Sequence, residues 1–305
     1  MCYVLVTPAK NEELYIQKTL DSVVAQEIRP LRWVIVSDGS TDRTDMIVSR
    51  YAEQHAFIRL VRRESGTHDF RSKVQAFEAG CKELEDVSYE FIGNLDADIE
   101  LPTDYYSQLL QRFAGDGKLG LAGGTRRDRC GESFVRVRFS EFSIGGAYQL
   151  FRRSCYEDIG GYQALEFGGE DMVAGIMARH LGWTVRGFAD LEVLHHRPTG
   201  IAQGNVARCG FRNGLKNHAI GYHPLFESLK LLRAWRPAEV LHNLSEFAGF
   251  TFAAMRGKGF CVPGPVVKSL RAEQLKRLRA VTLRYRAPGV GTSESSQVTR
   301  RSVNS

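Results

Sequence analysis

Short apolar runs alternate with helix-length amphipathic stretches along the first 122 residues of the chain. The runs are rich in β-forming residues and are bounded by helices, which is typical of strands buried on both faces of a sheet. In chain order, the pattern predicts strand 3–6, helix 12–24, strand 33–36, helix 41–54, strand 58–61, helix 72–84, and strands 89–95 and 119–122. Alternating strands and helices predict an α/β domain built on a mostly parallel sheet.

The pattern changes after residue 124, and beyond Pro198 the chain is helix-rich and basic. It predicts a half-exposed strand at 133–139, a helix at 172–181, a strand at 184–194, and helices at 201–220, 224–235, 237–255 and 265–286. Residues 287–305 are rich in Gly, Ser, Thr and Arg and have little to bury, so we expect them to be disordered. The chain therefore divides into a sheet-based domain (1–200), a helical extension (201–286) and a tail (287–305).

The composition excludes several classes of protein. With 305 residues, 43% hydrophobic and 25% charged, the chain is neither wholly disordered nor a fibrous repeat. Its six cysteines are scattered and form no CxxC pair, which argues against a zinc module or a disulfide scaffold and favours a reducing cytosol. We find no signal peptide and no apolar stretch of about 18 residues, so we expect a cytoplasmic protein without a membrane span.

The net charge of +6 conceals two regions of opposite sign. Residues 1–196 hold 23 basic and 30 acidic residues, a net charge of −7, whereas residues 197–305 hold 18 and 5, a net charge of +13. This asymmetry indicates an acidic body with a basic arm that contacts phosphate, nucleic acid or an anionic membrane surface.

Polar motifs follow the predicted strands at their carboxyl ends, where ligands of open α/β sheets bind. Asp96 and Asp98 flank a small residue, so both carboxylates point to one face. Two such oxygen ligands suit a divalent cation held together with substrate phosphates, and the alternative is a solvated acidic turn. Asp38 lies in a DGS turn, where it either shapes the turn or accepts a hydrogen bond from a base or ribose, and Thr41 is a candidate N-cap.

Two further motifs occur in the second half of the domain. Glu170 and Asp171 open a helix behind a glycine pair, where they either complement the helix dipole or act as a general base about 3 Å from an acceptor hydroxyl. His195 and His196 end a strand on opposite faces, so only one can point into a site. A structural hydrogen bond and a metal contact are both open for that histidine.

Taken together, these motifs resemble the family 2 glycosyltransferases of the A-type fold. The segments TPAKNEE, SDGSTD, DAD, GGED and VLHHR occur in that family's order and at compatible spacings. The resemblance covers roughly residues 2–200, and the basic helical remainder is similar to the variable C-terminal extension of such enzymes. It implies a Rossmann-like, mostly parallel sheet and a hexosyltransferase that uses a nucleotide-diphosphate sugar with inversion.

The resemblance also implies a role for each matching residue. Nucleotide-binding residues would be Pro8, Lys10, Asn11, Glu12, Asp38, Lys73 and Asp96. The ligands of Mg²⁺ or Mn²⁺ would be Asp96, Asp98 and His195. The catalytic base would be Asp171, with Glu170 beside it. The acceptor would be a hydroxyl of a glycan, a polysaccharide or a lipid-linked saccharide. At Lys73 the sequence departs from the family, because the usual Gly-Lys context is replaced by Arg71-Ser-Lys73.

Other functions lack their sequence signatures. A sugar nucleotidyltransferase needs a glycine-rich loop after the first strand and a dehydrogenase needs GxGxxG there, but residues 7–12 contain no glycine. A catalytically inactive, transferase-like binding subunit is disfavoured by the intact DAD and ED motifs. No nucleic-acid-binding module accompanies the basic arm, so we expect no nucleic-acid partner.

The basic helix at 266–286 allows two interpretations. Its leucines and basic residues form an amphipathic pattern that suits peripheral contact with an anionic membrane, such as the inner face of the cell membrane. Alternatively, the helix packs its leucines on the sheet domain and solvates its charges. Membrane contact would suit an acceptor built on a lipid carrier.

Overall fold

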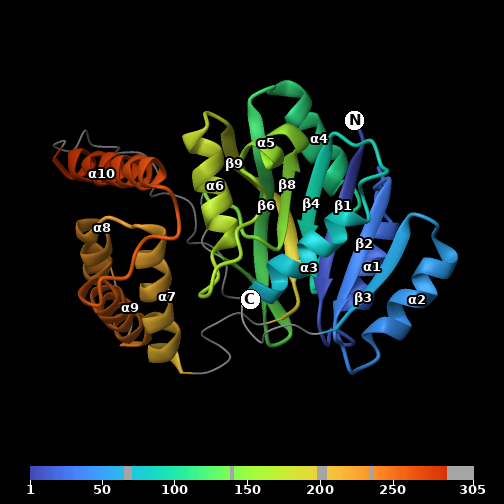
Figure 1. Ribbon diagram of the computed structural model, residues 1–305, viewed down its shortest axis with the longest axis horizontal. Helices are drawn as coiled ribbons and strands as arrows, with labels where there is room; N and C mark the ends of the chain where they lie inside the picture. The colour runs from blue at the N-terminus through green and yellow to red at the C-terminus, as the bar shows by residue number, and fades with distance from the viewer. Residues whose placement is uncertain (65–70, 138–140, 198–204, 234–236, 287–305) are drawn as a thin grey trace, which may run out of the picture.

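A computed structural model describes residues 1–64, 71–137, 141–197, 205–233 and 237–286 (Figure 1). The predicted disordered tail lies outside the described residues, as does the first part of the predicted helix 201–220.

The core is a nine-stranded sheet in the order β3-β2-β1-β4-β8-β6-β9-β5, with β7 paired to β6. The strands are β1 (Tyr3–Ala9), β2 (Arg32–Asp38), β3 (Ile58–Arg63), β4 (Phe91–Leu95), β5 (Ile99–Glu100), β6 (Leu119–Cys130), β7 (Ser133–Arg136), β8 (Tyr148–Arg152) and β9 (Thr184–His195). The strands β1, β2, β3, β4, β6 and β9 run in one direction, and β5, β7 and β8 run against them. The predicted α/β fold with a mostly parallel sheet is therefore confirmed.

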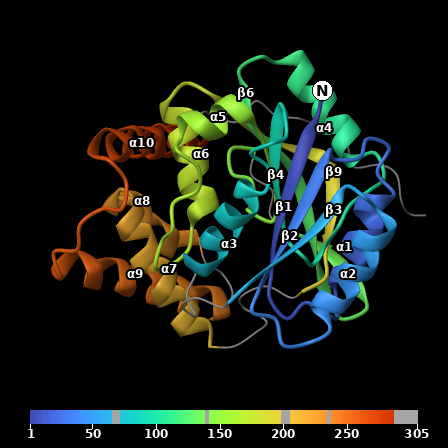
Figure 2. The same cartoon turned by 45° about the vertical axis from the view of Figure 1, so that its right-hand side comes forward.

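Helices cover both faces of this sheet, with α3 on one face and α1 and α2 on the other (Figure 2). The helices of the sheet domain are α1 (Ile16–Val24), α2 (Thr44–Gln54), α3 (Arg71–Lys82), α4 (Tyr105–Gly115), α5 (Arg153–Asp158) and α6 (Glu170–His180). Their apolar faces and the strands share one large core, whose biggest fully buried side chains include Trp33, Tyr3 and Tyr105.

The predicted N-cap at Thr41 is wrong. Helix α2 begins at Thr44, after Arg43 in the cap position, and the Thr41 N–H instead donates to the side chain of Asn11. Asp42 supplies the local acceptor, because its Oδ1 takes the Thr44 N–H at 2.9 Å. A carboxylate is a stronger acceptor than a hydroxyl, which explains why the helix starts after the acid.

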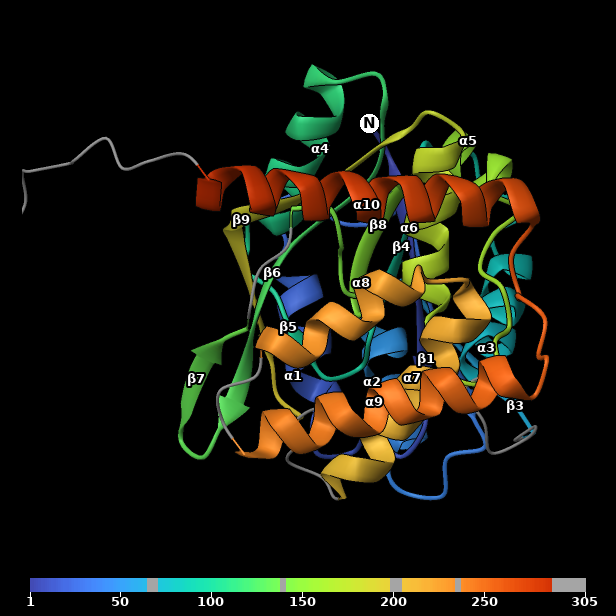
Figure 3. The ribbon, with the colours of Figure 1, turned by 90° about the vertical axis from the view of Figure 1, so that its left-hand side faces the viewer.

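The remaining helices lie together on one side of the sheet domain, next to α6 (Figure 3). They are α7 (Val206–Ile220), α8 (Pro224–Leu229), the 3₁₀ turn η2 (Lys230–Arg233), α9 (Pro237–Met255) and α10 (Gly264–Arg286). A second apolar core joins them to α6 through Val173, Ile176, Ile220, Val266 and Leu270. This core places the helical layer against the helix that carries Glu170 and Asp171.

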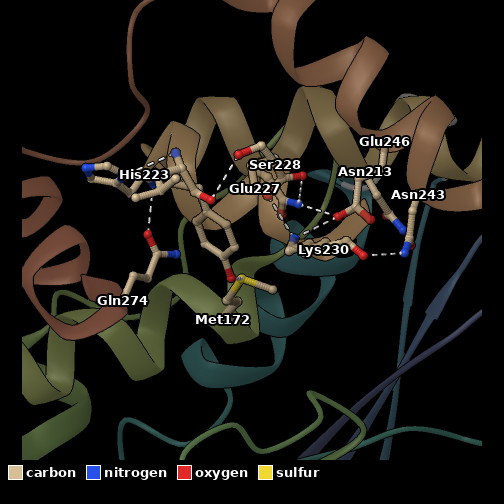
Figure 4. A network of polar contacts seen from close by, with 12 residues as sticks. Met172, Asn213, His223, Glu227, Ser228, Lys230, Asn243, Glu246 and Gln274 are labelled. Atoms are coloured by element: carbon tan, nitrogen blue, oxygen red, sulfur yellow. Dashed lines mark hydrogen bonds and ion pairs between the residues drawn. The ribbon is translucent and has the colours of Figure 1, made fainter. Parts of the chain in front are cut away.

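Helices α7 and α9 touch backbone to backbone. A Cβ atom on Gly214 would lie 1.9 Å from the Glu246 carbonyl oxygen, so only glycine permits this approach. Beside the contact, the Lys230 ammonium lies 2.8 Å from Glu227 and 2.9 Å from Glu246 (Figure 4). The Asn217 amide of α7 donates to the same two carboxylates. The two buried acids are therefore each bound by the Lys230 ammonium and by the Asn217 amide.

Helix α10 turns its apolar side chains inward. Val266, Val267 and Leu270 are buried, and Arg179 of α6 pairs with Glu273 at 3.1 Å. Of the two arrangements that the sequence of this helix allows, the first half of α10 adopts the one in which its apolar side chains pack on the sheet domain. No helix in the described part of the chain is long and apolar enough to cross a membrane.

Candidate active site

The carboxyl ends of β1, β2 and β4 lie at the lower edge of the sheet in Figure 1. Residues at and just after these ends line a cavity of about 260 Å³. Its lining residues are Pro8, Ala9, Lys10, Glu12, Asp38, Ser72, Lys73, Ala76, Asp96, Ala97 and Asp98. The cavity therefore brings together every predicted nucleotide-binding residue except Asn11, and it also includes Asp98.

Asn11 does not line the cavity but joins two of the loops around it. Its backbone has a left-handed φ of 55°, which Asn tolerates better than most residues. Its N–H donates to Ser40 Oγ at 3.2 Å, and its Oδ1 accepts the Thr41 N–H at 2.8 Å. The loop after β1 is thereby tied to the loop after β2.

Asp38 is buried at the end of β2 and faces two partners. The Ser72 hydroxyl of α3 donates to one carboxylate oxygen, and Arg63 Nε lies 3.2 Å from the other. The second oxygen forms an ion pair but no hydrogen bond within the described residues, so it can accept one from a ligand.

Lys73 of α3 pairs with the DAD segment, and its charge also acts on Glu170 at the start of α6. Its ammonium lies 2.7 Å from Asp96 Oδ1 and 2.9 Å from Oδ2. Burial alone would lower the pKa of Lys73, but the charges of Asp96 and Glu170 outweigh it and raise the pKa. Burial also raises the pKa of Glu170, and the Lys73 ammonium opposes that effect. A single cation thus faces acids from both motifs.

Asp98 lies in a network of charged groups. Arg197 Nε contacts its Oδ2 at 3.2 Å, and the same guanidinium bonds to Glu12. His195 Nε2 lies 3.4 Å from that oxygen. Although burial acts in the opposite direction, these contacts hold the pKa of Asp98 below its usual range. Burial raises the pKa of Glu12 to about 7 against the effect of Arg197.

The two histidines diverge as expected for neighbouring residues of a strand. His195 Nδ1 faces Asp128 at 3.0 Å, and although burial alone would lower its pKa, Asp98 and Asp128 raise it. His196 points elsewhere, with Nε2 at 2.7 Å from Glu100. Of the two side chains, that of His195 is the one that reaches Asp98, whereas His196 contacts the DAD segment through its backbone N–H, which donates to the Asp98 carbonyl at 2.9 Å.

Asp171 is held at the start of α6 by two backbone donors. Its Oδ2 accepts the Gly146 N–H at 2.9 Å, and its Oδ1 accepts the Met172 N–H at 2.8 Å. A Cβ on Gly146 would come within 3.0 Å of the Asp171 Cβ, so glycine permits this approach. Asp171 lines a separate cavity of about 100 Å³ rather than the one beside Asp96.

Two residues of this network were absent from the sequence-based candidates. Arg197 directly follows the histidine pair, and its position in the VLHHR motif was the available signal. Asp128 gave no signal, because it meets His195 only through the pairing of β6 with β9, where the two residues are register partners.

The residues present fit a divalent cation shared with a substrate. No group of three or more His, Cys, Asp or Glu side chains is already arranged as a metal site within the described ranges. Mg²⁺, however, is usually bound by one or two carboxylates together with substrate phosphates. Asp98 Oδ1 is buried without a hydrogen-bond partner among the described residues, which leaves it available as a ligand.

Comparison with known proteins identifies the family of this chain. Residues 4–167 match the family described as glycosyl transferase family 2. The chain belongs to this family. The matched region contains the predicted nucleotide-binding residues and both acids of the DAD segment, and it ends before Glu170, Asp171 and His195.

Relatives of this family-2 chain include enzymes of polysaccharide synthesis. The poly-beta-1,6-N-acetyl-D-glucosamine synthase of Staphylococcus epidermidis is 28% identical over 169 residues, which cover 49% of this chain and 39% of that protein. The chain thus matches about two fifths of the length of this relative.

Two solved structures share the fold. A mannosyltransferase from Pyrobaculum calidifontis in complex with GDP-Man and Mn²⁺ superposes with a TM-score of 0.53 and 19% identity, covering 92% of this chain and 80% of that one. TarS 1–349 of S. aureus in complex with UDP-GlcNAc gives a TM-score of 0.54 and 16% identity, covering 88% and 78%. The A-type glycosyltransferase fold is confirmed.

Proposed function

We propose that this chain is an inverting glycosyltransferase that moves a sugar from a nucleotide-diphosphate donor to an acceptor hydroxyl. The observation that carries the proposal is the cavity at the carboxyl edge of the sheet, where Asp38, Lys73 and the DAD acids meet from separate segments of a family-2 chain. The relatives act in polysaccharide synthesis, which supports a glycan, polysaccharide or lipid-linked saccharide as the acceptor.

The reaction places charge where this cavity has compensating groups. Glycosyl transfer passes through an oxocarbenium-like state while negative charge grows on the leaving diphosphate. Asp38 would accept a hydrogen bond from the base or ribose, and Lys73 would face the phosphates from α3. A divalent cation held by Asp96 and Asp98, with His195 beside them, would supply Lewis-acid neutralisation of the leaving diphosphate.

Asp171 is the candidate base for the acceptor hydroxyl. The two backbone N–H groups that bind its oxygens fix the orientation of the carboxylate before the acceptor arrives. Its position outside the donor cavity fits a base that receives the acceptor from another side, which is what inversion requires. Glu170 is the next residue along the chain, and the positive charge of Lys73 acts to lower its pKa.

A nucleotide panel tests the donor part of the proposal. We expect uridine, guanosine or thymidine diphosphate, in the presence of Mn²⁺, to raise the melting temperature of the protein. A ligand at a hundred times its Kd stabilises the folded state by about 2.7 kcal/mol. A stabilisation of this size gives a measurable rise in the melting temperature. The Asp38→Asn variant should lose most of the shift. Identical melting curves with all three nucleotides and without them would contradict the proposal.

We also propose that the chain contacts anionic membranes from its cytoplasmic side through α9. Leu241, Leu244, Phe252 and Met255 are exposed and lie within one face of this helix. Arg256 and Lys258 follow at its end, in a region of net positive charge. An apolar face flanked by basic residues is the pattern of interfacial helices.

Vesicle flotation tests this membrane contact. The protein should float with vesicles rich in phosphatidylglycerol and remain unbound with pure phosphatidylcholine. Replacing Leu244 and Met255 together by Ser should weaken binding about a hundredfold or more, because burial of each such side chain contributes about 1.5–3 kcal/mol. Leu31→Ser, at an exposed leucine outside α9, is the matched control. Equal flotation with both vesicle types would sink the proposal.

A further inference from the structure

A second cavity lies outside the donor site, where the loop before α6 meets α7 and the segment that joins α9 to α10. Its volume is about 300 Å³, the low end of the range of ligand pockets. Apolar side chains form much of the wall, among them Phe167, Leu215 and Phe260. None of these residues takes part in the donor site or in the charged network around Asp98.

The cavity borders the start of α6. Gly168 lines it, and Asp171 follows three residues later. Gly169 has a left-handed φ of 97°, and a Cβ there would meet the Lys216 and Ile220 side chains of α7 at 3.0 and 3.2 Å. The opposite wall is held by the Cys261 N–H, which donates to the Ala219 carbonyl at 2.7 Å. The cavity is thus bounded by fixed backbone close to the candidate base.

One wall contains a buried histidine with unused hydrogen-bonding capacity. The His218 ring packs between those of Phe250 and Phe260, at centroid distances of 5.4 and 5.6 Å. Its Nδ1 is buried and has no hydrogen-bond partner among the described residues. Burial, together with Arg271, lowers the pKa of His218, so the wall adds no charge at neutral pH.

Two lysines supply the charge at this cavity. Lys216 projects from α7, and the Lys258 ammonium lies 5.6 Å from the centre of the Phe167 ring. Neither lysine forms an ion pair with a carboxylate in the part of the chain that the structure describes, and the exposed Glu166 is the one acid of the lining. An apolar pocket with two unpaired ammonium groups suits a ligand that has an apolar chain and an anionic group.

We propose that this cavity binds the lipid-phosphate portion of the acceptor, with the apolar chain against Phe167, Leu215 and Phe260 and the phosphate near Lys216 and Lys258. The inference rests on the proposed transferase function and names the class of its acceptor. Because about 300 Å³ holds only part of a lipid chain, the remainder leaves past the exposed Phe260. That exit lies in the segment following α9, the helix with the exposed apolar face.

Calorimetric titration of the full chain with three probes tests the assignment. We expect farnesyl phosphate to bind, and inorganic phosphate alone and farnesol alone to bind at least about tenfold more weakly. The double variant Lys216→Gln, Lys258→Gln should weaken binding of farnesyl phosphate about a hundredfold or more, because it removes both cations that would face the phosphate. Lys268→Gln, at an exposed lysine of α10, is the control and should bind normally.

A second variant tests the apolar wall. Ala219→Phe places a large ring into the cavity and should abolish binding of farnesyl phosphate while the melting temperature and the nucleoside-diphosphate shift stay unchanged. Equal affinity for farnesol and farnesyl phosphate, or unchanged affinity in the lysine double variant, would overturn the assignment. If nucleotides bind and farnesyl phosphate does not, this inference fails and the transferase proposal stands; if nucleotides also fail to bind, the transferase proposal fails as well.

Discussion

Replacing Asp171 by Asn is expected to abolish sugar transfer and to leave donor binding intact. General-base catalysis contributes about 10²- to 10⁴-fold to a rate, and an amide cannot take the acceptor proton. The fold should survive, since the Asn side-chain oxygen can still accept the Gly146 N–H that now bonds to Oδ2. Incorporation of radiolabelled sugar measures transfer, and the nucleotide-induced melting shift measures donor binding.

The neighbouring acid provides the control for this substitution. Glu170→Gln keeps the shape of the first turn of α6 and removes a carboxylate whose pKa is influenced by Lys73. The Gly146 N–H donates to Asp171, so this substitution leaves that hydrogen bond in place. We expect a smaller loss of activity from it than from Asp171→Asn. Unchanged turnover in the Asp171 variant, or the larger loss in the Glu170 variant, would show that the base has been assigned to the wrong residue.

Removal of divalent cations is expected to stop transfer, and Asp98→Asn should reproduce the effect. Lewis-acid neutralisation of the leaving group contributes several kcal/mol, and each 1.36 kcal/mol is a factor of ten in rate. The loss should therefore be about a hundredfold or more. Asp98 is the informative position because its Oδ1 forms neither a hydrogen bond nor an ion pair within the described residues, whereas Asp96 Oδ1 lies 2.7 Å from the Lys73 ammonium.

The measurement is the same radiolabelled-sugar assay in excess chelator, followed by addition of Mn²⁺ or Mg²⁺. Wild-type activity should return with the metal, and Asp98→Asn should stay inactive at metal concentrations that restore the wild type. Asp190→Asn is a suitable control, because it breaks only an exposed ion pair with Arg112, and such pairs contribute little to stability. Full activity in excess chelator would refute the metal-binding role of the DAD acids.

Strands β1, β2 and β4 were predictable because each is a local, largely apolar run that is buried in the sheet. Strand β3 was also predicted but is not buried on both faces, because it lies at the edge of the sheet. Strand β8 was missed, since Tyr148–Arg152 mixes apolar and polar residues in the sequence and becomes a strand by pairing antiparallel to β4 and β6. Helix α4 was also missed, although its Tyr105 and Tyr106 are fully buried. Pairing between distant segments decides β8. Helix α4, in contrast, buries Tyr105, Tyr106, Leu109, Leu110 and Phe113 at helical spacing, so its local periodicity was a usable signal.

The candidate site was predictable where a motif directly follows a strand, because the sheet itself brings the carboxyl ends together. Asp38, Asp96 and Asp98 reach one cavity for that reason. Asn11 also follows a strand, in the TPAKNEE segment after β1, but its side-chain oxygen accepts the Thr41 N–H instead of lining the cavity. This contact depends on the conformation of two loops, which the sequence does not reveal. Which helix of the extension exposes apolar side chains was not predictable, because it depends on tertiary packing: Val266 and Leu270 of α10 pack against α6, whereas Leu244 and Met255 of α9 are exposed.

The hydrogen bonds between Asn11 and the loop after β2 affect the entropy cost of binding a nucleotide in the proposed donor cavity. Ordering a backbone residue costs roughly 1–2 kcal/mol of conformational entropy. Since the hydrogen bonds to Ser40 and Thr41 already exist, that cost is met when the chain folds and not when a ligand arrives. We therefore expect a nucleotide to bind in a single kinetic step on this side of the cavity, without a slow rearrangement of the two loops after the first encounter.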